Sequence, residues 1–122
     1  MIEDRALLEQ LAEHVYEPSN LLGAAFVVAM TTQGKGPTSF DAGRAAQNML
    51  LAAWNEGVAG VPNGMTDADR IAELLEVEQG ERPAIILSFG YPDPPRHPER
   101  RTAQEWSARA KRRPLDELVR HR

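Results

Sequence analysis

The stretch that decides the fold is "SFDAGRAAQNMLLAAWNEGVAGVPNGM", residues 39–65. Between residues 45 and 54 only two side chains are polar, and the run ends at Gly57, a residue type that often follows the last turn of a helix. This pattern predicts a central apolar helix over 40–57. Because a helix that is apolar on almost every side has to be covered, we expect it to run through the core or through a subunit interface.

The residues after this helix, 58–65, include Pro62, Asn63 and Gly64. These three residue types favour turns, because proline presets one backbone angle while asparagine and glycine tolerate conformations that other residues avoid. We therefore predict a turn whose backbone amides point in set directions. This turn is either a simple connection between two helices or a wall of a binding site, and the residues by themselves leave both interpretations open.

The rest of the first 90 residues alternates between helical and strand-like patterns. Helical spacing of apolar residues predicts amphipathic helices over 4–15 and 66–75. Apolar and β-branched runs at 23–31 and 83–90 predict two buried strands. Two strands are few for a stable sheet. We therefore predict an α+β fold in which a small, incomplete sheet is packed by helices.

The length and composition indicate one ordinary globular domain. A chain of 122 residues has room for a single core, so we expect residues 1–122 to form one domain. The chain has no cysteine, and its three histidines are far apart in the sequence, so we expect no metal site. Its acidic amphipathic N-terminus and short apolar runs predict a cytoplasmic protein without a membrane partner.

The charge is unevenly distributed, and residues 91–122 are expected to form an extended basic segment. Residues 96–122 contain nine basic and four acidic side chains, a net charge of +5, whereas residues 1–95 carry −9. The run "RAKRRPLDEL", residues 109–118, has the side chains that hydrogen-bond phosphate oxygens. Since Trp106 is the only aromatic residue after position 95, stacking on bases has little support, and we expect no nucleic-acid partner.

Recognisable catalytic motifs are missing from the sequence. No serine lies in the glycine context of a nucleophile elbow, and neither a phosphate-cradling GxxxxGK nor a dinucleotide GxGxxG motif is found. Redox or group-transfer chemistry would therefore have to come from an organic cofactor that the protein binds and orients.

Three motifs in order resemble the FMN-dependent nitroreductase family. They are "SFDAGRAAQNMLLAAWNEGVAGVPNGM", "PAIILSFGYPDPP" and "KRRPLDELV". The resemblance covers the C-terminal two thirds of that family's domain. It implies a homodimeric α+β sandwich with FMN at the subunit interface. It also implies hydride transfer from NAD(P)H through the flavin to a nitroaromatic, a quinone or a similar small-molecule acceptor.

The same resemblance implies which residues bind the cofactor. Pro62, Asn63 and Gly64 would lie beside the isoalloxazine, with backbone amides near its reactive nitrogen. Three basic residues match those that approach the FMN phosphate: Lys111, Arg112 and Arg113. No residue of this chain is assigned a catalytic role.

The N-terminal part of the family pattern has no counterpart in this sequence. Members usually begin with an Arg-rich "R-R-S-x-R" segment that binds phosphate, but before Lys35 the only basic residue here is Arg5. We therefore expect a nitroreductase-like domain that is truncated at its N-terminus. The alternative interpretation is a catalytically silent dimerisation or interaction module derived from the same fold.

Overall fold

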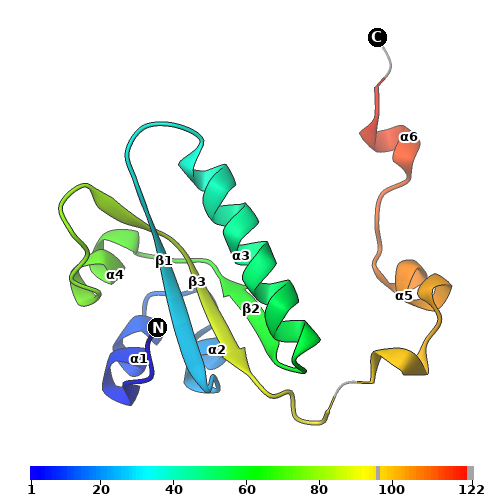
Figure 1. Cartoon of the computed structure of the whole chain (residues 1–122), viewed down its shortest axis with the longest axis horizontal. Coiled ribbons are helices and arrows are strands. Elements are labelled where there is room, and N and C mark those ends of the chain that lie inside the picture. The colour runs from blue at the N-terminus through cyan, green and yellow to red at the C-terminus, as the bar shows by residue number, and fades with distance from the viewer. Residues whose placement is uncertain (96, 121–122) are drawn as a thin grey trace. The chain divides into compact units, whose positions relative to one another are not determined.

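A three-stranded antiparallel sheet organises the first part of the chain. The computed structural model describes residues 1–95 and 97–120, and its internal contacts divide the chain into two units, Met1–Pro92 and Asp93–Arg122. In the first unit the strands are β1 (Phe26–Gln33), β2 (Ala59–Asn63) and β3 (Glu81–Gly90). They lie in the order β1-β3-β2, so β3 is central (Figure 1).

Strand β2 corrects one prediction. Residues 58–65 were expected to be a turn, but Ala59–Asn63 pairs with β3, and Pro62 lies opposite Leu87. The prediction of a turn is wrong because β2 is an edge strand, where a proline without an N–H group is tolerated. The expectation of only two strands is wrong for the same reason. The other two predicted strands are confirmed, with shifted ends.

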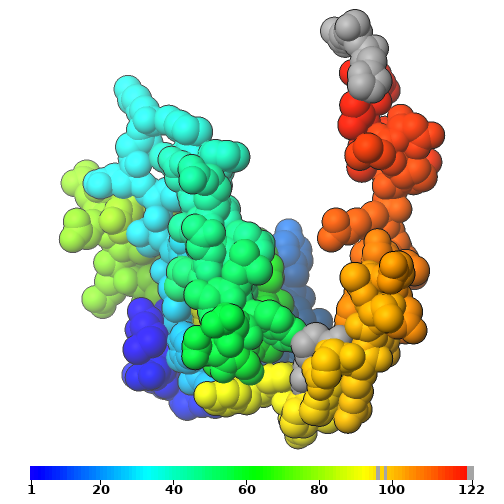
Figure 2. Space-filling view, turned by 45° about the vertical axis from the view of Figure 1, so that its right-hand side comes forward, coloured from blue at the N-terminus to red at the C-terminus, as the bar shows by residue number. Residues whose placement is uncertain are grey.

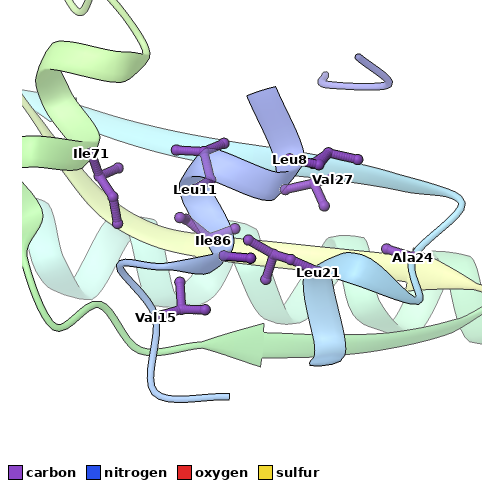
Figure 3. Packing of buried hydrophobic residues seen from close by; sticks show 9 residues of the cluster. Leu8, Leu11, Val15, Leu21, Ala24, Val27, Ile71 and Ile86 are labelled. Atoms are coloured by element: carbon purple, nitrogen blue, oxygen red, sulfur yellow. The ribbon is translucent and has the colours of Figure 1, made fainter. Parts of the chain in front are cut away.

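Side chains of the strands point alternately to the two faces of the sheet, and each face contributes to its own hydrophobic cluster. On one face, Val27 and Ile86 pack with buried residues of three helices: α1 (Arg5–Ala12), α2 (Pro18–Leu22) and α4 (Ala68–Leu74). Figure 3 shows this cluster, with the labelled side chains of α1, α2 and α4 directed toward the two strands. On the other face, Leu87 and Phe89 pack beneath the remaining helix of the first unit.

That helix, α3 (Thr38–Asn55), is the apolar helix predicted at 40–57. It ends just before Gly57, whose positive φ of 75° is a backbone conformation that glycine adopts readily. Within the helix only Ala42 and Ala46 are buried. The opposite side of α3 is exposed along its length (Figure 2).

Local hydrogen bonds explain where two of the helices begin. The Asp4 side chain caps α1 by accepting from the N–H of Ala6 at 2.8 Å. Helix α4 is capped by Asp67, one residue after the predicted helix start at 66, because its carboxylate accepts from the N–H of Arg70 at 2.9 Å. Helix α2 has no counterpart among the sequence predictions.

The second unit contains short helices without a buried core. A 3-10 turn (Pro98–Arg100) precedes α5 (Ala103–Arg109) and α6 (Leu115–Leu118). From residue 93 to residue 120, every side chain whose burial is described is exposed. Across the described residues of both units, no helix combines the length and the apolar character needed to cross a membrane.

Candidate functional site

A cavity of about 470 Å³ lies between α3 and the sheet. Its wall combines residues from one side of α3, from the end of β2, from the start of β3 and from β1. The lining residues are Thr32, Ser39, Ala42, Gly43, Ala46, Gln47, Leu50, Pro62, Arg82, Pro83, Ala84 and Ile85. Cavities of this size hold small organic ligands in other proteins.

The lining is mostly small and apolar, with a few polar groups. No atom lies within 4 Å of the position that a Cβ on Gly43 would take, so this part of α3 leaves open space. Around it, the Gln47 amide can both donate and accept hydrogen bonds, and Arg82 supplies a cation. Apolar walls with a small number of polar groups suit a flat organic ring whose edge needs hydrogen-bond partners.

Of the predicted flavin-binding residues, Pro62 lines this cavity. Asn63 does not line it, and its side chain is used within the fold instead. The Asn63 side chain is only 3% exposed and is held by hydrogen bonds. Its Nδ2 donates to the backbone oxygens of Val61 at 3.0 Å and Ile86 at 3.3 Å, and to Ser88 Oγ at 3.1 Å. Its Oδ1 accepts from Asn20 Nδ2 at 2.9 Å. The Asn63 side chain therefore fixes β2, and only its backbone remains for a ligand.

Two glycines let β2 approach its neighbours closely. A Cβ at Gly60 would lie 2.5 Å from Leu50 Cδ2 and 2.8 Å from Phe89 Cε1, closer than real contacts allow. At Gly64, a Cβ would lie 2.9 Å from the ring of Tyr16. These glycines therefore bring β2 against α3 on one side and the segment after α1 on the other.

The basic residues predicted to bind the FMN phosphate lie in the second unit. Lys111, Arg112 and Arg113 follow one another between α5 and α6, and all three are exposed. Lys111 has a positive φ of 48°, which breaks the helical path after α5. Residues 62–64 and residues 111–113 thus belong to different units.

Sequence reasoning missed the four polar residues of the cavity: Thr32, Ser39, Gln47 and Arg82. Gln47 offered a signal, because it is a polar interruption in an apolar helix. Arg82 offered little, since a charged residue at the start of a strand is common. It is the structure that connects it to α3, where Arg82 Nη2 donates to Thr38 Oγ1 at 3.4 Å.

The architecture is that of an α+β protein with a cavity between a helix and an antiparallel sheet. The sequence profile of the nitroreductase family matches residues 2–91, about three quarters of the chain. The chain therefore belongs to the nitroreductase family, and the predicted family and fold class are confirmed. A comparison with curated protein sequences gives no match.

Solved structures agree on the fold. A nitroreductase family protein from Clostridium difficile 630 has a TM-score of 0.74 and 23% identity, over 98% of this chain and 70% of that one. A nitroreductase family protein from Clostridium novyi NT gives 0.69 and 16%, over 79% and 62%. Iodotyrosine deiodinase, solved with FMN and 3-iodo-L-tyrosine, gives 0.67 and 21%, over 79% and 66%. The chain thus spans 62–70% of the lengths of these proteins.

Proposed function

We propose that this protein is an FMN-dependent oxidoreductase that passes hydride from NAD(P)H, through the flavin, to a nitroaromatic, a quinone or a similar acceptor. The observation that carries the proposal is the cavity between α3 and the sheet, with Pro62 on its border. Family membership supports it, and so does the likeness in fold to iodotyrosine deiodinase, a protein solved with FMN.

The residues around the cavity fit an isoalloxazine. Gly43 and the buried Ala42 and Ala46 are small residues of α3 at the cavity, and the open space at Gly43 would accept a ring. Gln47 offers the donor and acceptor that the polar edge of such a ring needs. When bound, FMN supplies the hydride chemistry, and the protein contributes binding, orientation and exclusion of water.

Individual residues have distinct tasks in this proposal. Pro62 lies at the wall of the site, and the Asn63 hydrogen bonds hold its strand in place. Leu50, which lines the cavity, keeps water from one side of the ring. The basic run 111–113 has side chains that can bind a phosphate such as that of FMN, because guanidinium and ammonium groups form charge-assisted hydrogen bonds with phosphate oxygens.

We further propose that two copies of the chain pair through α3. Its outer side carries Phe40, Leu51 and Trp54, which are 65%, 58% and 46% exposed, and their spacing places them on one stripe of the helix. Large apolar side chains gathered on one face of a helix are typical of an interaction surface. A dimer formed this way agrees with the predicted homodimer.

The test is spectroscopic. The purified full chain is incubated with FMN, freed of unbound flavin, and scanned for the absorbance of bound flavin. The sample is then mixed with NADH or NADPH, with and without a nitroaromatic or quinone. We expect a yellow protein that oxidises a nicotinamide cofactor in the presence of an acceptor. A protein that stays colourless and leaves both nicotinamides unoxidised contradicts the proposal.

A second function is supported by the same exposed stripe of α3. The chain would then be a catalytically silent dimerisation module, since pairing through Phe40, Leu51 and Trp54 needs no cofactor. Sedimentation distinguishes the two functions. A stable dimer that takes up no FMN favours the silent module, and nicotinamide oxidation rules it out.

A further inference from the structure

Among the described residues that line the cavity between α3 and the sheet, Arg82 is the only charged one. It lies at the start of the central strand β3, and its Nη2 donates to Thr38 Oγ1 at 3.4 Å. In the part of the chain that the structure describes, ion pairs join Arg70 to Glu73 and His97 to Glu99, and none involves Arg82. Arg82 therefore lines the cavity, and its guanidinium has no carboxylate partner among the described residues.

Arg82 is an exposed cation in a unit that is acidic overall. Residues 1–92 contain five basic and thirteen acidic side chains, a net charge of −8. The negative charge of this unit repels anions at long range. The described residues that line the cavity include no acidic side chain, so this repulsion has no local source at the cavity wall. One unpaired guanidinium in such a place is suited to hold an oxyanion, because its N–H groups match carboxylate and phosphate oxygens in geometry as well as charge.

We infer that Arg82 is a specificity-determining residue that binds the oxyanion group of the ligand in this cavity. The inference rests on the proposed function in naming that ligand. The oxyanion has two sources: the carboxylate of an aromatic electron acceptor and the phosphate of FMN. Because the family resemblance implies that residues 111–113 bind the phosphate, we expect Arg82 to give the cavity a preference for acceptors with a carboxylate.

Two matched pairs of probes test the inference by direct binding to the full chain. FMN and riboflavin differ by the phosphate, and 4-nitrobenzoate and 4-nitrobenzamide differ by the charge. Binding of the flavins is followed by quenching of their fluorescence, and binding of the nitroaromatics by calorimetry. The variants are R82Q, which removes the charge, and R82K, which keeps the charge but loses the planar fork. The control is R70Q, which makes the same charge change on α4, across the sheet from the cavity.

We expect R82Q to weaken binding of the oxyanion-bearing member of one pair by about tenfold, the effect of losing one charge-assisted hydrogen bond, and its neutral partner by less than about twofold. R82K should recover part of the loss, and R70Q should match the unchanged protein. A loss confined to 4-nitrobenzoate identifies the acceptor, and a loss confined to FMN identifies the phosphate. Weaker binding with rising salt should accompany either result.

The inference is overturned if R82Q affects both members of each pair equally, if R70Q has the same effect as R82Q, or if the unchanged protein binds none of the probes. The proposed function fails in a different way. It fails if neither flavin binds the unchanged protein, and in that case the nitrobenzoate pair still decides the role of Arg82. Thermal unfolding of each variant verifies that the changes in binding occur in folded protein.

Discussion

Asn20 Nδ2 donates a hydrogen bond to Asn63 Oδ1 at 2.9 Å and so ties α2 to the edge strand β2. The Nδ2 of Asn63 continues the connection to the carbonyl of Ile86 and to Ser88 Oγ on β3. Both side-chain atoms of this buried residue are therefore satisfied. The network fixes strand β2, which places Pro62 at the wall of the cavity. Pro62 and Asn63 were expected to form a turn, but both belong to this strand.

Replacing Asn63 by alanine should destabilise the fold. The change removes one hydrogen bond each from Ser88 Oγ, the Ile86 carbonyl and the Asn20 amide. Ser88 Oγ keeps its bond to the Val61 oxygen, at 3.4 Å. Loss of several buried hydrogen bonds is expected to lower the free energy of unfolding by about 2–4 kcal/mol. Urea denaturation followed by circular dichroism measures this change. Asn55→Ala, on an exposed residue, is the control and should change the free energy of unfolding by less than about 0.5 kcal/mol. Equal stability of the two variants would show that the network does not hold β2.

A methyl group at Gly60 should push β2 away from α3. Because the added Cβ would come within 2.5 Å of Leu50 and 2.8 Å of Phe89, Gly60→Ala is expected to cost about 1–3 kcal/mol of folding stability. Gly43→Ala is the control, since its Cβ meets no atom and alanine favours a helix. It should leave stability unchanged or raise it by up to about 1 kcal/mol. Thermal unfolding distinguishes the two variants, and a Gly60→Ala protein as stable as the original would contradict the close approach.

Helix α5 should lose part of its structure in acid. The backbone N–H and the hydroxyl of Thr102 hydrogen-bond the Glu105 carboxylate at 2.7 and 2.9 Å, and they hold the pKa of Glu105 below its ordinary value. A lowered pKa means that the ionised carboxylate stabilises the helix start at pH values above the unfolded pKa, and that this stabilisation disappears as the pH falls through the folded pKa.

The test is to measure the chemical shifts of the α5 amides by NMR while the pH is lowered through the pKa of Glu105. They should move toward coil values as Glu105 protonates. Glu105→Gln keeps an oxygen that can accept from Thr102 but cannot titrate in this range, so its α5 shifts should be independent of pH. A pH response of the same size in this variant would show that the hydrogen bonds between Thr102 and Glu105 are not its cause.

Pairing through α3 should depend on Leu51, which is 58% exposed on the outer stripe. A buried carboxylate at a dimer interface is costly, so Leu51→Glu is expected to raise the dimer dissociation constant by about a hundredfold. Leu22→Glu changes another half-exposed leucine, at the end of α2, and should leave the dimer intact. Analytical ultracentrifugation measures both. A dimer that survives Leu51→Glu would remove α3 from the proposed interface.

The elements predicted correctly are those whose pattern is local. The apolar repeat of residues 40–57 and the apolar run of residues 83–90 needed no distant partner to be recognised, and both are confirmed. Strand β2 was missed because Pro62 and Asn63 are typical of turns, and only pairing with β3, more than twenty residues later, makes them extended. Gly60 was an available signal, since glycine inside a strand often marks a close approach.

The cavity was predicted only in part for the same reason. Pro62 was selected through the family resemblance, and it does line the cavity. Arg82 and Ser39 were not predicted as site residues. They line the same cavity only because the start of α3 packs beside the start of β3, and the sequence pattern of neither segment specifies that packing. The assignments of Pro62, Asn63, Gly64 and residues 111–113 to the flavin stay predictions.

The most direct test of the proposed function is a flavin titration of the full chain and of a variant whose cavity is filled. Gly43→Phe places a ring in the open space at Gly43, and Ala45→Phe makes a similar change at an exposed residue of α3 that does not line the cavity. If the cavity holds the isoalloxazine, the original chain and Ala45→Phe bind FMN, whereas Gly43→Phe binds it at least about tenfold more weakly. A chain that binds no FMN, or a Gly43→Phe variant that binds it as well as the original, would contradict the central claim.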